Sequence, residues 1–183
     1  MPSKAKCQFI VRKAELSDLP VLVNFQTRLA LHVAGDPTNR LKEEERERLM
    51  IVLRSLLSSK DKRIVVAQAP NGDLLGMGYV HIFKDQGIWE LAGEVELKSA
   101  IIDDVWVEPD FRRLGVFTAM LRELVTFAEK HKAYELILEY ATANKEAAAT
   151  WTSLGFVPTG VRASAFTEVV QEKLGKRREP GNR

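Results

Sequence analysis

Apolar positions along the chain fall into helical and strand-like spacings in a regular order. Residues 8–12 alternate and are rich in β-formers, which predicts a first strand. From residue 17, a Ser-Asp capping pair, a proline in the first turn and apolar residues three or four apart predict a helix that ends before Gly35. Over 41–57 the same spacing returns behind a charged run, so we expect a second helix with one solvated face.

The middle and end of the chain predict a hairpin followed by alternating strands and helices. Residues 63–68 and 74–80 are apolar runs joined by a turn with Asn-Gly, a pair that tolerates the positive φ angles of a tight hairpin. Polar, acidic residues at 84–99 predict a loop. The later expected elements are a strand at 100–107, a helix at 116–132, a strand at 134–140, a helix at 144–154 closed by Gly155, and one or two strands from 156 to near 170. This order indicates a mixed α/β sheet with one strand–helix–strand crossover.

Composition narrows the class of protein. The 183 residues fit one domain, which we place at 1–174, followed by a basic and disordered tail at 175–183. The net charge of +2 is too close to zero to indicate a nucleic-acid or anionic-membrane partner, and no apolar run is long enough to cross a bilayer. The lone Cys7 and an amino terminus without a secretory pattern favour a cytoplasmic location.

The segment V-E-P-D-F-R-R-L-G-V-F-T at 107–118 carries the clearest chemistry. A strand ends, a proline starts a turn, and an arginine-rich loop leads directly into a helix. Free N–H groups at a helix start, together with the helix dipole, form an anion site. Gly115 lets the backbone approach a phosphate closely, and Arg112 or Arg113 can add charge. An ordinary strand–helix turn is an equally good interpretation of this loop by itself.

A second pattern follows at the right distance: Asn144-Lys145-Glu146-Ala147, then Trp151 and Leu154-Gly155-Phe156. With both patterns the chain resembles the GNAT superfamily of N-acetyltransferases. Residues 107–117 are similar to its acetyl-CoA motif, V-x-P-x-[YF]-[RQ]-x-x-G-x-[GA], and residues 144–156 to its next motif, N-x-x-A-x-x-[FL]-Y-x-x-x-G-F. The resemblance implies a single-domain α/β (α+β) fold with a mixed, mostly antiparallel central sheet, a β-α-β acyl-CoA-binding core and helices on both faces.

The resemblance also implies an activity: transfer of an acetyl group from acetyl-CoA, as co-substrate, to a primary amine of a small molecule or peptide, without a metal. The N–H groups of 113–118 would bind the pyrophosphate, strand residues 105–107 would bind the pantetheine arm, and the N–H of Val107 would polarise the thioester carbonyl. The implied cofactor-binding residues are Val105, Trp106, Val107, Arg112, Arg113, Leu114, Gly115, Val116, Phe117, Thr118, Asn144 and Trp151.

Three positions depart from the family motifs. Phe117 stands where a small residue is usual, and we expect its ring to pack against the sheet while its amide stays available. Thr150 replaces a larger apolar residue. Trp151 occupies the place of a tyrosine that is proposed to protonate the leaving thiolate, and an indole N–H donates a hydrogen bond but transfers no proton at neutral pH. Packing of Trp151 against the cofactor's arm is the favoured alternative.

An alkylamine arrives protonated, so a base is needed, and a carboxylate acting through water is one solution. The catalytic candidates are Asp104, Glu139 and Asp103, on strands that flank the expected cleft. Some polyamine-acetylating relatives carry an acidic pair at the aspartates, and some relatives that acetylate protein N-termini carry their proposed base at Glu139. Adjacent strand residues face opposite ways, so only one aspartate should face the cleft unless a bulge re-aims them. A carboxylate hydrogen-bonded at a strand end is the structural alternative for each.

The histidines His32, His81 and His131 are interpreted as structural, with only His32 close enough to the expected acceptor walls to test. Those walls are expected at 32–40 and 83–98. Two other functions stay open at this point: a module that binds acyl-CoA without turnover, suggested by Trp151, and a nucleic-acid-binding domain, which rests on the basic tail alone. A homodimer is also possible, since late strands often pair in this family.

Overall fold

A computed structural model describes residues 8–35, 40–84, 92–93 and 96–175. The chain divides into two compact units, Met1–Glu139 and Tyr140–Arg183, which are described separately here. Most of the predicted loop at 84–99 and most of the predicted tail at 175–183 lie outside the described residues.

The first unit contains one five-stranded sheet in the order β1-β2-β3-β4-β5. Its strands are β1 (Ile10–Lys13), β2 (Lys62–Gln68), β3 (Leu74–Lys84), β4 (Lys98–Val107) and β5 (Glu135–Leu138). The first four pair antiparallel, and β4 pairs parallel with β5 across the crossover helix. The predicted mixed, mostly antiparallel sheet and its single crossover are therefore confirmed. Gly72, at a φ of 94°, closes the predicted β2–β3 hairpin.

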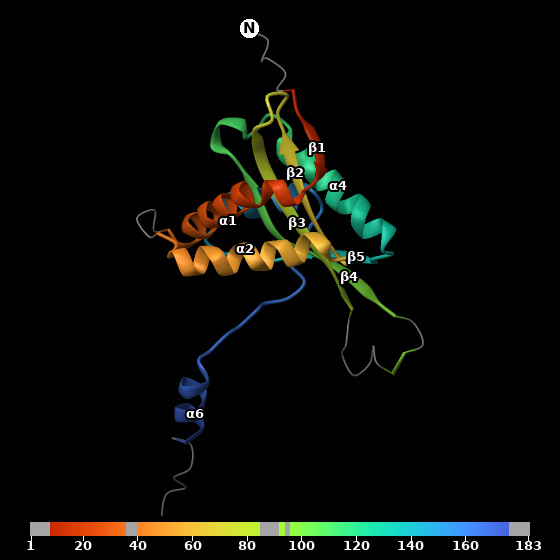
Figure 1. The fold of residues 1–183 in the computed structure, drawn as a ribbon. Coiled ribbons are helices and arrows are strands. Elements are labelled where there is room, and N and C mark those ends of the chain that lie inside the picture. The colour runs from red at the N-terminus through yellow and green to blue at the C-terminus, as the bar shows by residue number, and fades with distance from the viewer. Residues whose placement is uncertain (1–7, 36–39, 85–91, 94–95, 176–183) are drawn as a thin grey trace, which may run out of the picture. The chain divides into compact units, whose positions relative to one another are not determined.

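Helices cover both faces of this sheet (Figure 1). On one face lie α1 (Leu19–Ala34) and α2 (Glu43–Ser58), whose buried side chains share a core cluster with alternate residues of β2, β3 and β4. The members that the sheet contributes to this cluster are Ile64, Val66, Met77, Tyr79 and Trp106. We call this side of the sheet the α1 face. The two helices match the sequence predictions, and Gly35 ends α1 in a left-handed conformation.

The opposite face carries α4 (Val116–Lys130), the crossover helix. Two glycines of β3 make its close approach possible. A side chain on Gly76 would meet the backbone of β4, and one on Gly78 would lie 3.0 Å from the Leu124 side chain of α4. The buried stripe of α4 is Val116, Met120, Leu121, Leu124, Phe127 and Ala128. Phe117 is only half-buried, so the predicted stripe is shifted by one residue at the start of the helix.

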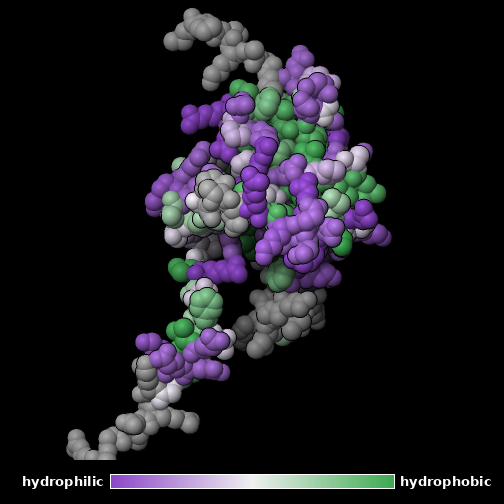
Figure 2. Space-filling model, turned by 60° about the vertical axis from the view of Figure 1, so that its left-hand side comes forward, coloured by the Kyte–Doolittle hydropathy of each residue, from purple (hydrophilic) through white to green (hydrophobic). Residues whose placement is uncertain are grey.

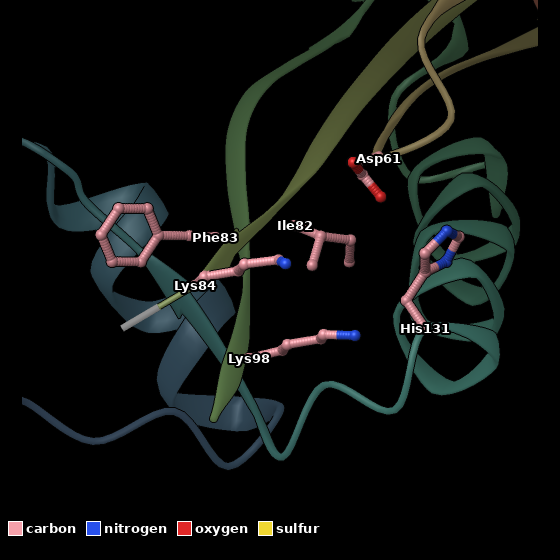
Figure 3. Close-up of a pocket in the computed structure, with 6 residues that line it drawn as sticks. All are labelled: Asp61, Ile82, Phe83, Lys84, Lys98 and His131. Carbon is pink, nitrogen blue, oxygen red and sulfur yellow. The ribbon is translucent and has the colours of Figure 1, made fainter. Parts of the chain in front are cut away.

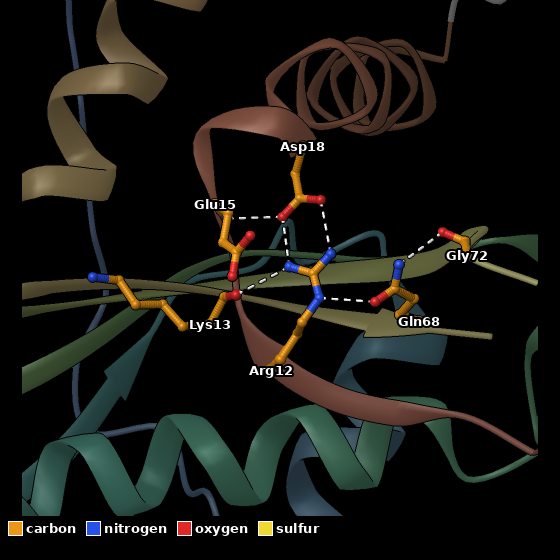
Figure 4. Close-up of polar contacts among 6 residues, drawn as sticks. All are labelled: Arg12, Lys13, Glu15, Asp18, Gln68 and Gly72. Atoms are coloured by element: carbon orange, nitrogen blue, oxygen red, sulfur yellow. Dashed lines mark hydrogen bonds and ion pairs between the residues drawn. The ribbon is translucent and has the colours of Figure 1, made fainter. Parts of the chain in front are cut away.

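A buried ion pair fixes the entry into α1 (Figure 4). The guanidinium of Arg12 donates to both carboxylate oxygens of Asp18 at 2.7 and 2.9 Å, and to Gln68 at 2.9 Å. The backbone N–H of Glu15 donates to the same carboxylate at 2.8 Å. Asp18 thus caps the short 3-10 turn η1 (Leu16–Asp18) and makes no side-chain cap of α1, which corrects the expected Ser-Asp cap. Because Arg12 belongs to β1, its ion pair with Asp18 connects this strand to the start of α1.

The second unit contains α5 (Lys145–Ser153) and α6 (Thr167–Gly175). The carbonyl oxygen of the Asn144 side chain accepts the N–H of Ala147 at 3.0 Å and caps α5, and Gly155 follows that helix at a φ of 90°. Both ends of this helix match prediction. The strands expected after Phe156 are wrong: residues 157–166 form no strand, and Thr167–Gly175 is a helix. The Glu, Gln and Lys residues of that stretch are strong helix formers and outweigh its two valines.

The surface drawn in Figure 2 is mostly polar, with apolar side chains in small groups among charged ones. Exposed apolar side chains of the first unit include Val33, Ile51 and Val52 on α1 and α2. Within the described ranges, no helix combines the length and the apolar character needed to span a bilayer.

Candidate active site

The loop between β4 and α4 has the backbone shape of an anion site. After the 3-10 turn η2 (Pro109–Phe111), Arg113 and Gly115 both take positive φ angles, 61° and 88°. No described atom lies within 4 Å of the position a side chain would take on Gly115. The space above this glycine is therefore open. A ligand group can occupy the position where any other residue would place its side chain.

The start of α4 directs N–H groups into that space. The first bond inside the helix runs from the N–H of Ala119 to the carbonyl of Gly115 at 3.0 Å, and no side chain caps this end. The N–H groups that precede it, such as those of Val116 and Thr118, have no acceptor within the helix. Together with the positive end of a 15-residue helix they suit a diphosphate, so the residues present fit the predicted cofactor.

Arg112 is one of the two arginines expected to add charge to the loop. Its Nε donates to the carbonyl of Val107 at 3.1 Å, and its guanidinium lies 5.3 Å from the ring centre of Trp106. The side chain therefore folds back onto the end of β4 instead of extending along the loop. Arg113, which is exposed, is the arginine available to add charge beside the loop.

The last residues of β4 present an open edge. Pairing with β5 ends at Ile102, so no strand of the described residues pairs with 103–107 on that side. On the other side, the N–H of Glu108 donates to Leu75 at 2.9 Å, which makes Glu108 and Leu75 a hydrogen-bonded pair. Hydrogen-bonded and non-bonded pairs alternate along an antiparallel ladder. The N–H groups of Val107 and Val105 therefore point away from β3, toward the open edge, as the predicted role of Val107 requires.

A bulge brings both aspartates to the same face. The register shifts between Gly78 and Val80, so that Asp103 and Asp104 together lie opposite Tyr79. Before the shift, Ile101 pairs with His81, and Asp103, two residues after Ile101, therefore points to the α1 face. After the shift, Trp106 pairs with Met77, and Asp104, two residues before Trp106, therefore points to the same face. The sequence rule that allows one aspartate per face is thus overridden by one extra residue in β4.

The aspartates have different partners on this face. Asp104 accepts a hydrogen bond from the side-chain amide of Gln26 in α1 at 2.9 Å. Oδ2 of Asp103 lies 3.0 Å from Nδ1 of His81. The His81 ring stacks on Tyr79, with ring centres 5.7 Å apart. Tyr79, His81, Asp103, Asp104 and Gln26 are together called the acidic cluster.

Burial and neighbouring charges shift the pKa of two groups in this cluster. Burial raises the pKa of the Asp103 carboxyl, and the charges of Asp104 and Glu139 raise it further, while His81 opposes the change. Burial, with the negative charges of Asp103 and Asp104, raises the pKa of Tyr79 to about 12. Glu139 itself is exposed and follows the last residue of β5. The three predicted carboxylates are therefore grouped within the first unit.

Sequence reasoning missed His81 and Tyr79. Both lie more than twenty residues before Asp103 and Asp104 in the chain. The only pattern in the sequence that marks them is that two polar rings occupy alternate positions of one strand. His32, the histidine that was favoured, makes an edge contact with Trp106 at 6.1 Å between ring centres. His131 lies at the far end of α4, where its ring nitrogens contact the carbonyls of Phe127 and Lys60.

The remaining predicted residues lie in the second unit. The Asn144 side-chain oxygen is engaged in capping α5, which leaves its amide group for the predicted contact with a cofactor. Trp151 is buried and makes an edge contact with Phe156 at 5.3 Å.

A pocket of about 370 Å³ lies at the opposite end of the sheet (Figure 3). Lys84 and Lys98 extend toward His131 there, while Phe83 points away. Both lysines contact Glu96, at 3.0 and 3.2 Å, so this one carboxylate offsets part of their positive charge. The pocket contains none of the predicted catalytic or cofactor-binding residues, although Phe83, Lys84 and Lys98 belong to the expected acceptor wall at 83–98, and it is set aside as a reaction site.

The chain is similar to known N-acetyltransferases. The chain is 33% identical over 73 residues to the ribosomal protein bS18-alanine N-acetyltransferases of Escherichia coli and Shigella flexneri, which is 40% of this chain and 49% of theirs. The chain thus spans about half the length of the curated relatives it matches.

Solved structures share the fold. Glucosamine-6-phosphate N-acetyltransferase from Arabidopsis thaliana superposes with a TM-score of 0.62 at 23% identity, over 87% of this chain and 99% of that one. The enzyme AAC(6')-Iy, solved with the bisubstrate analogue CoA-S-monomethyl-acetylneamine, superposes with a TM-score of 0.69 at 15% identity, over 87% and 98%. At these identities the likeness concerns the fold alone. The family model described as "Acetyltransferase (GNAT) family" matches residues 29–156, more than half of the sequence, and the chain therefore belongs to the GNAT family of acetyltransferases.

Proposed function

We propose that this protein transfers an acetyl group from acetyl-CoA to a primary amine by direct attack of the amine on the thioester. The proposal rests on two features that lie next to each other in the first unit. An open N–H-lined loop leads into α4, and an open edge of β4 runs from that loop to the acidic cluster. A donor and an acceptor can therefore meet at the same short strand segment.

The loop and the strand edge suit the donor. The N–H groups of Val116 and Thr118 suit the diphosphate, with Gly115 providing the open space and Arg113 the charge. The N–H groups of Val105 and Val107 suit the pantetheine arm and the thioester carbonyl, because they point to the unpaired side of β4. Arg112 fixes this strand end through the carbonyl of Val107. Acetyl-CoA supplies the activated acyl group, and the chain supplies binding and orientation.

The acidic cluster suits the acceptor. Asp103, Asp104 and Glu139 place negative charge around a partly covered surface, which favours a cationic amine over a neutral or anionic group. The printed names of similar proteins include acceptors as different as a protein alanine and glucosamine-6-phosphate, which share a primary amine. The amine, rather than the rest of the acceptor, is thus the feature on which the proposal depends.

The experiment is a thioester-consumption assay with a panel of primary amines, combined with calorimetry of acetyl-CoA binding to the same preparation. We expect micromolar binding of acetyl-CoA and amine-dependent release of free thiol. Aspartate-to-asparagine variants of both cluster aspartates should reduce turnover without loss of acetyl-CoA affinity. Failure of acetyl-CoA to bind would overturn the proposal entirely.

One observation favours a second function. Trp151, at the position of the family's tyrosine, cannot supply a proton to a leaving thiolate. A chain that binds acetyl-CoA but consumes none with any amine of a broad panel would be an acyl-CoA-binding module. Turnover is favoured because an alkyl thiol has a pKa of roughly 8.5, so a thiolate can leave without a full proton transfer.

A further inference from the structure

We propose that His81 accepts the proton that the acceptor amine must lose, and that Asp103 is a positioning residue that holds the His81 ring. The inference rests on the proposed function, because it names the base of the same site. It replaces the expectation that a carboxylate, acting through water, takes the proton.

The contact between the two side chains selects the state of the ring. Nδ1 of His81 is fully covered and lies 3.0 Å from Oδ2 of Asp103, an ion-pair contact that falls outside hydrogen-bond geometry, and no other described group bonds to this nitrogen. A carboxylate accepts, so Nδ1 carries the hydrogen and the lone pair of the neutral ring is left on Nε2. The His81 side chain keeps 24% of its surface exposed although Nδ1 is covered. The exposed part of the ring therefore lies away from Asp103, where a water or an amine can reach it.

Stacking removes the remaining freedom of the ring. The planes of His81 and Tyr79 are 25° apart, and both residues stand on the same face of β3. Burial and the two aspartates raise the pKa of Tyr79 to about 12, so its hydroxyl stays protonated at neutral pH and adds no charge. Tyr79 supports the ring from one side while Asp103 holds Nδ1.

Carboxylates outnumber cations around His81. The ring is faced by Asp103 and Asp104 of β4, by Tyr79 of its own strand, by the cross-strand neighbour Lys62 of β2, and by the neutral Gln26 of α1 near Asp104. Glu139, after β5, adds a third carboxylate to the group. The surroundings of the ring therefore hold three carboxylates and one lysine.

The choice of histidine follows from proton affinity. General-base efficiency is greatest when the base has a pKa near the working pH, and an ordinary histidine, at about 6.5, is much closer than an ordinary aspartate, at about 3.9. The amine starts as an ammonium with a pKa of about 10.4. Transfer to an ordinary imidazole is thus less unfavourable than transfer to an ordinary carboxylate by between about two and three powers of ten.

The proton balance closes without a further reactant. The ammonium gives one proton to Nε2 of His81, directly or through one water. The amine nitrogen then forms a bond to the acyl carbon, and the carbon–sulfur bond breaks. The second proton leaves the nitrogen for the thiolate sulfur, which yields free CoA and the amide, and the imidazolium releases the first proton to solvent.

The first test reads the ring itself and needs no activity. Nitrogen NMR of the full chain, with histidines labelled, should show His81 in the Nδ1–H form in the neutral state, and Asp103→Asn should remove this preference. His131→Gln assigns the resonance of a second histidine and should leave that of His81 unchanged. An Nε2–H form in the wild-type protein would overturn the inference whether or not the chain turns over acetyl-CoA.

The second test measures catalysis. His81→Gln should lower kcat by about 10²–10⁴-fold, the usual loss for a general base, while KM for the amine changes by less than about threefold. The wild-type kcat/KM should rise with pH across the range where histidines lose a proton, this rise should vanish in the variant, and added imidazole should restore part of the rate. Acetyl-CoA affinity and thermal unfolding of the variant, measured alongside, show that the donor site and fold persist.

The two proposals fail in different ways. Acetyl-CoA binding with full activity in His81→Gln would refute the role of His81 and keep the proposed function. No turnover by the wild-type chain, with the Nδ1–H form present, would refute the proposed function and leave the arrangement of His81 and Asp103 as found.

Discussion

Gly76 in β3 lies against the backbone of Trp106 in β4 so closely that a side chain there would place its Cβ 2.5 Å from the Trp106 carbonyl oxygen. The same Cβ would lie 3.2 Å from the Cα of Val107 and 3.3 Å from the end of Met120 in α4. The Met120 side chain can move, but the two backbone atoms cannot move without shifting β4. This glycine therefore sets the spacing between the helix and the strand edge that the proposed donor site uses.

Gly76→Ala should lower the free energy of unfolding by about 2–3 kcal/mol, since overpacking against backbone has no cheap relief. Urea denaturation followed by circular dichroism measures the effect. Gly160→Ala is the matched control, because no described atom lies within 4 Å of a Cβ at that position, and it should change stability by less than about 0.5 kcal/mol. Equal effects of the two substitutions would show that β3 and α4 are more loosely packed than described.

The Arg12–Asp18 pair should make part of the stability depend on pH. Burial alone would raise the pKa of Asp18, but hydrogen bonds from Arg12 and from the Glu15 N–H more than offset it, so the pKa lies below its ordinary value. The stabilisation is therefore complete above the ordinary aspartate pKa of about 4 and is lost as the pH falls through the lower folded value.

Asp18→Asn should cost about 2 kcal/mol of unfolding free energy at pH 7, the loss of hydrogen bonds to a charged group. The gap between wild type and variant should narrow as urea titrations are repeated toward pH 3 and below. Glu129→Gln, on the exposed side of α4, serves as control and should show no such gap. A gap that stays constant with pH would mean that the charge of Asp18 contributes nothing.

Gly115→Asp should weaken acetyl-CoA binding by at least about 30-fold. The new carboxylate would enter the space above the loop, repel a diphosphate and block its charge-assisted hydrogen bonds, each worth about 1.5–3 kcal/mol. Gly72→Asp controls for backbone strain, since Gly72 also has a positive φ angle, 94°, but sits in the hairpin turn. Calorimetry on both variants measures the difference. Retained affinity in Gly115→Asp would place the donor elsewhere.

Trp151→Tyr should keep the fold and raise kcat, because a phenol at this position can donate a proton to the leaving thiolate, an effect that reaches about 10²–10⁴-fold where a general acid limits the rate. Trp151→Phe is the matched control, which removes the indole without adding a hydroxyl. Steady-state rates at saturating acetyl-CoA decide between the outcomes. A large fall in kcat for the tyrosine variant would show that the indole has a role of its own.

Patterns within about fifteen residues predicted most of the fold. The helical spacing of α1, α2 and α4 and the Asn-Gly turn of the hairpin each report on local backbone geometry, and the structure confirms them. The loop at Gly115 was predictable for the same reason, since strand end, glycine and helix start are consecutive. The expected location in the cytoplasm, the homodimer and the absence of nucleic-acid, membrane and metal partners stay predictions.

Features that depend on pairing between distant segments were not predictable. The bulge at Asp103 and Asp104 exists only relative to Tyr79, about 25 residues earlier, so the sequence rule of alternating faces failed there. The turn of Arg112 toward Trp106 depends on which ring the fold brings near it. The prediction of strands after Phe156 was wrong because it gave two valines more weight than the helix-forming residues around them.

Because β4 carries one extra residue at the bulge, the strand pairing does not require both aspartates. Removing a single residue at the bulge would leave Ile102 opposite Val80 and Val105 opposite Gly78, with one acid facing Tyr79 in an uninterrupted ladder. A one-codon deletion would thus reduce the carboxylates of the site from three to two within the same strand pairing, which separates the tuning of acceptor preference from the framework that holds it.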